Sequence, residues 1–122
     1  MKKALIISFG LLLSTFVIGC SHSQDLYYWG DYSNTLYELK KSPDEKSMAA
    51  HTEMLKSIIE NSKKLNKRVP PGVYCEYGYM LLKTNHQAEA RQYFELEMQT
   101  YPESKVFIDR LLMDTAKTAE KK

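Results

Sequence analysis

The chain has 122 residues, with 17 basic and 15 acidic side chains, a formal net charge of +2 and two cysteines. The first 19 residues hold two lysines and no acid, so the remaining 103 residues carry 15 basic and 15 acidic side chains. This balance excludes nucleic-acid binding driven by overall charge, because phosphate contacts need a clustered basic surplus. Two cysteines are too few for a disulfide framework or a four-thiolate zinc site, and 103 residues suffice for one small domain.

Residues 1–19 have the composition of a signal peptide. Lys2 and Lys3 form a positive start, and an almost wholly apolar stretch follows from Ala4 to Phe16. This stretch is shorter than the ~20 residues needed to span a hydrocarbon core, and it has the length of a cleaved h-region. The alternative is an uncleaved N-terminal anchor helix.

A specific processing motif ends this segment. Val17-Ile18-Gly19-Cys20 resembles the bacterial lipobox. The resemblance implies cleavage before Cys20, and a diacylglycerol and an N-acyl lipid on that cysteine, which together give stable membrane anchoring. Lipoproteins kept in the inner membrane typically carry Asp at the position of Ser21. By similarity to enterobacterial sorting, Ser21 therefore predicts an outer-membrane protein that faces the periplasm. Residues 20–30 are then the lipidated N-terminus and an aromatic tether.

The sequence predicts an all-α domain over residues 31–117, with about five helices arranged in helical hairpins. A tail is predicted over residues 118–122. The spacing of Tyr32, Leu36 and Leu39 predicts a short helix over 31–40. A helix of about 20 residues follows, with Ser42 as its capping residue and Glu45 as the capping-box partner. The residues predicted to form the buried stripe of this long helix are Met48, Thr52, Leu55, Ile58, Ile59, Ser62 and Leu65.

The sequence Val69-Pro70-Pro71-Gly72 ends the long helix, and the spacing beyond it resembles a tetratricopeptide repeat (TPR). Gly78 and Ala90 are small where two helices cross closely, and Asn85 suits a left-handed turn between them. Glu97 departs from the pattern, which predicts an adapted or more exposed face. The large residues of the motif are Tyr74, Tyr77, Leu81 and Phe94, and Pro102 ends it.

A closing helix is predicted over 104–117, with Ile108, Leu111, Leu112 and Thr115 on one side. The predicted architecture is therefore TPR-like hairpins, and the alternative is an irregular helical bundle. No stretch has the alternation typical of a strand.

The sequence carries no catalytic motif, and we predict neither an enzyme nor a metal site. His22, His51 and His86 are dispersed, which favours solvated surface histidines. Cys75 is predicted to be a small, partly buried filler whose thiol pKa is raised by Glu76, and an intermolecular disulfide is the alternative.

Tyrosine is abundant, with nine tyrosines and one tryptophan in the chain. Tyrosine and tryptophan are enriched in binding hot spots, because they offer large area with few rotatable bonds. For the segment 27–29 three placements remain open: docking on the helical domain, contact with a partner, or a position among lipid headgroups. The residues predicted to bind a partner are Tyr27, Tyr28, Trp29, Tyr32 and Tyr79.

The lipobox, YYWGDYSNTLYEL at 27–39 and PPGVYCEYGYMLL at 70–82 together resemble a family of small proteobacterial lipoproteins whose domain has no assigned function. The similarity covers residues 20–115. It implies an accessory subunit of an outer-membrane lipoprotein assembly, with a partner similar to the curli secretion channel. We therefore expect a lipid-anchored, periplasm-facing helical-repeat adaptor for envelope proteins. The alternative is a lipoprotein that binds peptidoglycan or a small envelope ligand.

Overall fold

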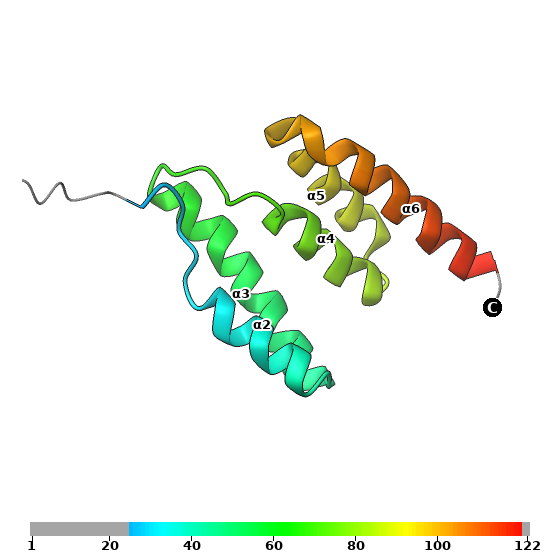
Figure 1. Cartoon of the computed structure of the whole chain (residues 1–122), viewed down its shortest axis with the longest axis horizontal. Helices are drawn as coiled ribbons and strands as arrows, with labels where there is room; N and C mark the ends of the chain where they lie inside the picture. The colour runs from blue at the N-terminus through cyan, green and yellow to red at the C-terminus, as the bar shows by residue number, and fades with distance from the viewer. Residues whose placement is uncertain (1–24, 121–122) are drawn as a thin grey trace, which may run out of the picture.

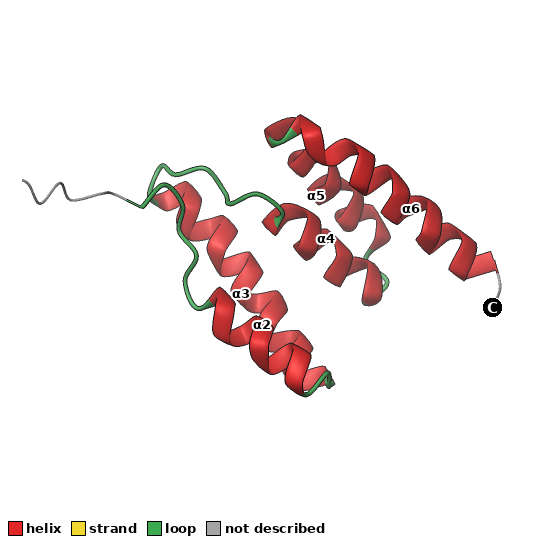
Figure 2. Cartoon of the chain, in the orientation of Figure 1, coloured by secondary structure: helices red, strands yellow, loops and turns green. Residues whose placement is uncertain are grey.

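A computed structural model describes residues 25–120, so the predicted signal peptide and the predicted lipidation site Cys20 lie outside the described residues. Within residues 25–120 every regular element is a helix, and no strand occurs (Figure 2). This confirms the predicted all-α fold of about five helices. The elements are α2 (Tyr32–Lys41), α3 (Glu45–Lys64), α4 (Val73–Lys83), α5 (Gln87–Thr100), the 3-10 turn η2 (Pro102–Ser104) and α6 (Lys105–Glu120).

The helices form two hairpins and a closing helix (Figure 1). Helix α2 packs on α3, α3 packs on α4, and α4 packs most extensively on α5. Helix α6 follows η2 and runs along the second hairpin. The turn between α2 and α3 lies at one end of the first hairpin, and the described chain begins at the opposite end, beside the end of α3 (Figure 1).

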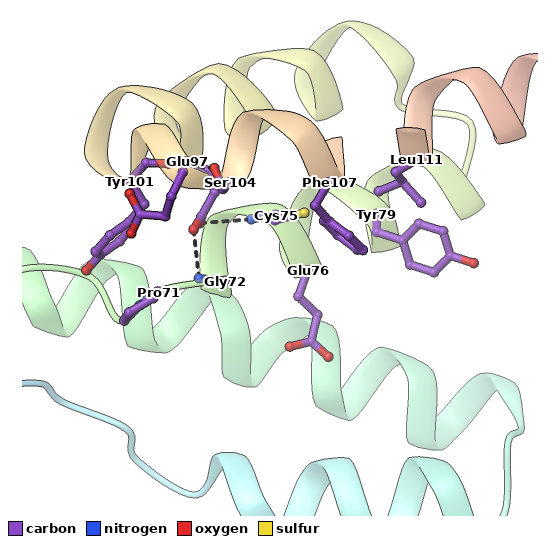
Figure 3. A pocket seen from close by; sticks show the side chains of 11 residues that line it. Pro71, Gly72, Cys75, Glu76, Tyr79, Glu97, Tyr101, Ser104, Phe107 and Leu111 are labelled. Carbon is purple, nitrogen blue, oxygen red and sulfur yellow. Dashed lines mark hydrogen bonds between the residues drawn. The ribbon is translucent and has the colours of Figure 1, made fainter. Parts of the chain in front are cut away.

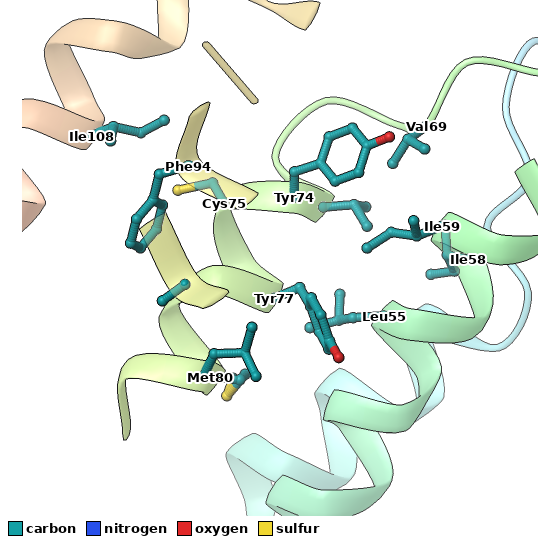
Figure 4. Packing of buried hydrophobic residues seen from close by; sticks show 13 residues of the cluster. Leu55, Ile58, Ile59, Val69, Tyr74, Cys75, Tyr77, Met80, Phe94 and Ile108 are labelled. Carbon is teal, nitrogen blue, oxygen red and sulfur yellow. The ribbon is translucent and has the colours of Figure 1, made fainter. Parts of the chain in front are cut away.

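The core lies where α3, α4 and α5 meet (Figure 4). Leu55, Ile58 and Ile59 of α3 face α4, as predicted, whereas Leu65, which was predicted in the same stripe, is exposed just beyond the end of α3. Each such side chain contributes about 1.5–3 kcal/mol when it is removed from water. The other core residues are Val69, Val73, Tyr74, Cys75, Tyr77, Met80, Leu81, Ala90, Phe94 and Ile108.

The close crossing of α4 and α5 occurs at Gly78. A Cβ atom at this position would lie 3.0 Å from Cε1 of Phe94 and 3.1 Å from the carbonyl oxygen of Ala90. Only glycine lets the two helices approach this closely, which confirms the role predicted for Gly78 and Ala90. Asn85 turns the chain between these helices at φ 66°, also as predicted.

The start of α3 differs from the prediction. Asp44, not Ser42, caps the helix: its carboxylate accepts a hydrogen bond from the Ser47 backbone N–H at 2.8 Å, and Ser47 Oγ accepts from the Asp44 N–H at 3.1 Å. The predicted box of Ser42 and Glu45 is therefore wrong. Asp44 forms the reciprocal pair because Ser47 lies three residues after it. The backbone hydrogen bond of Ser47 to the Asp44 carboxylate, followed by an interaction of the Ser47 side chain with it, lowers the pKa of this carboxyl.

Candidate functional site

A groove of about 620 Å³ lies between α4 and α6, with η2 at one end (Figure 3). Its lining is mostly apolar. The residues that line it are Pro71, Gly72, Cys75, Glu76, Tyr79, Glu97, Tyr101, Glu103, Ser104, Phe107 and Leu111.

Two helices supply the walls of the groove. Cys75 and Tyr79 lie four residues apart on α4, and Phe107 and Leu111 lie four residues apart on α6, so each pair shares one face of its helix. Figure 3 shows Phe107, Leu111 and Tyr79 close together. Phe107 is 63% exposed, although aromatic side chains gain most from burial. An exposed apolar side chain in a concave site marks a binding surface.

Glu97 forms the polar base of the groove. It is only 1% exposed, and its carboxylate accepts hydrogen bonds from the backbone N–H groups of Gly72 (2.8 Å) and Cys75 (3.3 Å). The first N–H groups of a helix have no partner within the helix, and the helix N-terminus attracts negative charge. Of the two expectations for Glu97, the more exposed face is therefore wrong and the adapted face is correct, because this side chain caps α4 from α5.

Glu76, on the adjoining face of α4, connects the groove to the first hairpin. Tyr32 Oη donates to Glu76 Oε2 at 2.8 Å, and His51 Nε2 lies 3.0 Å from Glu76 Oε1. A carboxylate only accepts, so Nε2 carries a proton. The other ring nitrogen of His51 lies 2.8 Å from Thr35 Oγ1. This polar network joins α2, α3 and α4.

His51 is fully buried, so its prediction as a solvated histidine is wrong. Both of its ring nitrogens have partners, and its ring centroid lies 5.4 Å from that of Tyr32. Buried polar groups are tolerated when they are hydrogen-bonded in this way. His86, by contrast, is exposed in the turn before α5.

The predicted partner-binding residues lie in two places. The Trp29 ring centroid lies 6.5 Å from Tyr27 and 5.3 Å from Tyr32, and Tyr28 packs against the core. Burial, followed by interaction with the neighbouring Tyr27 side chain, raises the pKa of Tyr101 to about 12. Residues 27–32 therefore contact the helical domain. Trp29 remains 42% exposed there.

Of the five residues predicted to bind a partner, Tyr79 lines the groove, and the other four lie between residues 27 and 32. Sequence reasoning missed Glu76 and Phe107 as site residues. The signal for Phe107 was its position beside the predicted stripe of α6, where it widens the apolar surface beyond one face. No comparable local signal marked Glu76, since its partners come from two other helices.

Cys75 has the packing role expected of it. The residue is buried, and burial, followed by the charges of Glu97 and Glu76, raises the pKa of its thiol to about 11. A thiol of this kind stays protonated at neutral pH and is a poor nucleophile.

Two further features are absent from residues 25–120. No group of three or more His, Cys, Asp or Glu side chains in this part of the chain could hold a metal ion. Likewise, none of the described helices is both long and apolar enough to cross a membrane.

Comparison with known families gives one match. The model of a domain of unknown function (DUF4810) matches residues 26–111, which is most of the chain. The chain belongs to this family. The matched range starts at Leu26 and ends at Leu111, so it includes the aromatic segment and both walls of the groove. Neither a curated protein nor a solved structure matches the chain.

Proposed function

We propose that this protein is a lipid-anchored, periplasm-facing helical-repeat adaptor that binds an apolar segment of another envelope protein in the groove between α4 and α6. The observation that carries the proposal is the exposed Phe107 ring beside Tyr79 in a mostly apolar groove of about 620 Å³. Aromatic side chains at the centre of such a surface are the usual anchors of protein–protein contacts.

The edges of the groove indicate the chemistry of the bound segment. Glu103, exposed in η2, adds a carboxylate to the mostly apolar lining. It favours a segment in which apolar anchors are flanked by a basic side chain. The place of action rests on the lipobox at Cys20, and the role in an outer-membrane lipoprotein assembly with a curli-secretion-channel-like partner rests on the family resemblance alone.

A small apolar envelope ligand is the second candidate. The volume of the groove falls within the range of about 300–1,000 Å³ that is typical of small-molecule sites. Peptidoglycan is the weaker form of this candidate, because a sugar and peptide polymer would leave many polar groups unpaired against apolar walls.

Photo-crosslinking in cells tests the groove directly. A benzoylphenylalanine residue is placed at position 107, at position 79, or at position 106 as the control. Val106 is the neighbour of Phe107 on α6 and is 74% exposed, but it does not line the groove. We expect one discrete protein adduct from positions 107 and 79 and none from position 106.

The outcome separates the two candidates. The same adduct pattern at 106 and 107 would contradict binding in the groove. Lipid or small-molecule adducts at 107 and 79, with no protein adduct, would favour the small-ligand candidate. Phe107→Glu should then abolish partner recovery while Val106→Glu preserves it, because only the first places a charge against the apolar groove.

A further inference from the structure

The end of α3 carries a basic surface that the groove does not use. Lys63 and Lys64 lie in the last turn of the helix, and Lys67 and Arg68 follow in the loop. Residues 61–75 contain these four basic side chains and no acid. The nearest acids along the chain are Glu60 and Glu76. The mature chain is neutral overall, but this segment is strongly basic.

The described chain begins at the same place. Tyr27 neighbours Tyr101, whose Oη donates to the carbonyl oxygen of Val69 at 2.6 Å. The Arg68 guanidinium lies 4.8 Å from the centre of the Tyr101 ring. Tyr27 is thus held against the loop that follows α3, and Figure 1 shows the start of the described chain beside that loop.

Two exposed apolar side chains accompany the basic ones. Leu26 is 72% exposed and adjoins Tyr27, and Leu65 is 53% exposed between Lys64 and the loop. Lysines that surround exposed leucines are typical of surfaces that lie on a bilayer, where phosphates attract the amines and the leucines enter the headgroup boundary.

We propose that this basic face, formed by Leu26, Lys63, Lys64, Leu65 and Lys67, rests on the anionic phospholipid headgroups of the membrane. The proposal rests on the lipid anchor at Cys20 that the proposed function includes. The five residues from Ser21 to Asp25 reach at most about 18 Å, which keeps the start of the domain close to an anchored lipid. The face therefore sets the orientation of the domain, and a bilayer suits it better than an acidic protein because the anchored end of the chain adjoins it.

Amine labelling of the lipidated protein in vesicles tests this orientation. The protein is reconstituted in phosphatidylcholine vesicles, with and without phosphatidylglycerol, and treated with an acetylating reagent. Lys40, Lys41 and Lys46, at the far end of the first hairpin, serve as controls in the same molecule. With phosphatidylglycerol we expect labelling of Lys63, Lys64 and Lys67 to slow about fivefold, the factor that corresponds to about 1 kcal/mol per surface lysine.

High salt should remove this protection, since it screens the phosphates. Acrylamide quenching of Trp29, the single tryptophan, gives a second measurement. K63Q/K64Q/K67Q should increase quenching in phosphatidylglycerol vesicles, whereas K40Q/K41Q/K46Q should not. Equal labelling of both lysine sets in both kinds of vesicle would overturn the proposal. Protection that requires an added acidic protein would also overturn it, in favour of a protein partner.

The mass of the Cys20 peptide reports the anchor separately. If this peptide carries no lipid, the lipid anchor of the proposed function is wrong. The labelling is then repeated on protein that floats with phosphatidylglycerol vesicles. Protection of Lys63, Lys64 and Lys67 in that sample would support the membrane-binding face without the anchor. An unlipidated chain that neither floats nor shows protection would contradict both.

Discussion

The two hairpins of the molecule are held by different forces. None of the ten residues of α2, all of them described, is buried, and α2 is tied to α3 and α4 by the network of Tyr32, Thr35, His51 and Glu76. Helix α4, by contrast, has seven buried residues and meets α5 at a glycine crossing. In the first hairpin α3 belongs to the apolar core, whereas α2 depends largely on a few directional hydrogen bonds; the second hairpin depends on apolar burial. Helix α2 is therefore the element that we expect to open most easily.

The largest expected effect is in the second hairpin. Phe94→Ala removes a fully buried ring from the crossing of α4 and α5, and we expect a loss of about 3–5 kcal/mol in the free energy of unfolding. The matched change in the first hairpin is Leu39→Ala, at a partly buried position of α2, with an expected loss of about 1 kcal/mol. Urea unfolding followed by circular dichroism measures both. Similar losses would mean that the two hairpins do not differ as proposed.

An intermediate effect is expected at the cap of α4. Glu97→Gln replaces one carboxylate oxygen with a donor that faces the N–H groups of Gly72 or Cys75, which should cost about 2 kcal/mol. The control is Glu95→Gln on the exposed face of the same helix, which should change stability by less than about 0.5 kcal/mol. If both variants unfold at the same urea concentration, the buried carboxylate does not stabilise the second hairpin.

The smallest effect is expected in the polar network. Tyr32→Phe removes the hydrogen bond to Glu76 and should cost about 1 kcal/mol. Hydrogen exchange should accelerate for the amides of α2 and stay unchanged for those of α5, because the bond attaches α2 to α4 and does not involve α5. Tyr37→Phe, at an exposed position of α2, is the control. Acceleration in both helices would show that the hairpins open together.

Tyr32 also makes the free energy of unfolding depend on pH. Burial, followed by the hydrogen bond and charge of Glu76, raises the pKa of Tyr32 to about 12, whereas an unfolded tyrosine ionises near pH 10. Between these values the unfolded chain binds fewer protons than the folded chain, so stability falls as pH rises from about 10 towards 12. Tyr32→Phe should make this fall in stability shallower. Part of the fall should remain in the variant, because the pKa of Tyr101 is also raised to about 12.

Much of the fold could be predicted because it depends on neighbours in the chain. Gly72 takes the left-handed position before α4, Asn85 takes the left-handed turn before α5, and the spacing of Gly78 and Ala90 sets a close crossing. The prolines, however, do not end α3: it stops at Lys64, and Asn66 turns the chain at φ 52°. The cap of α3 was mispredicted for a related reason. Ser42 and Asp44 are both good capping residues, and the choice depended on Ser47 at the third helical position.

The sequence by itself determined the helical class and the helix order, since each follows from residues within a few positions of one another. Only the tertiary structure decided the site, because its contacts join distant residues: Tyr32 and Glu76 are 44 positions apart, and Gly72 and Glu97 are 25 apart. His51 and Glu97 are polar, so their types predicted exposure, and their burial became favourable only through partners on other helices. The groove likewise required the angle at which η2 sets α6 beside α4, which no local pattern encodes.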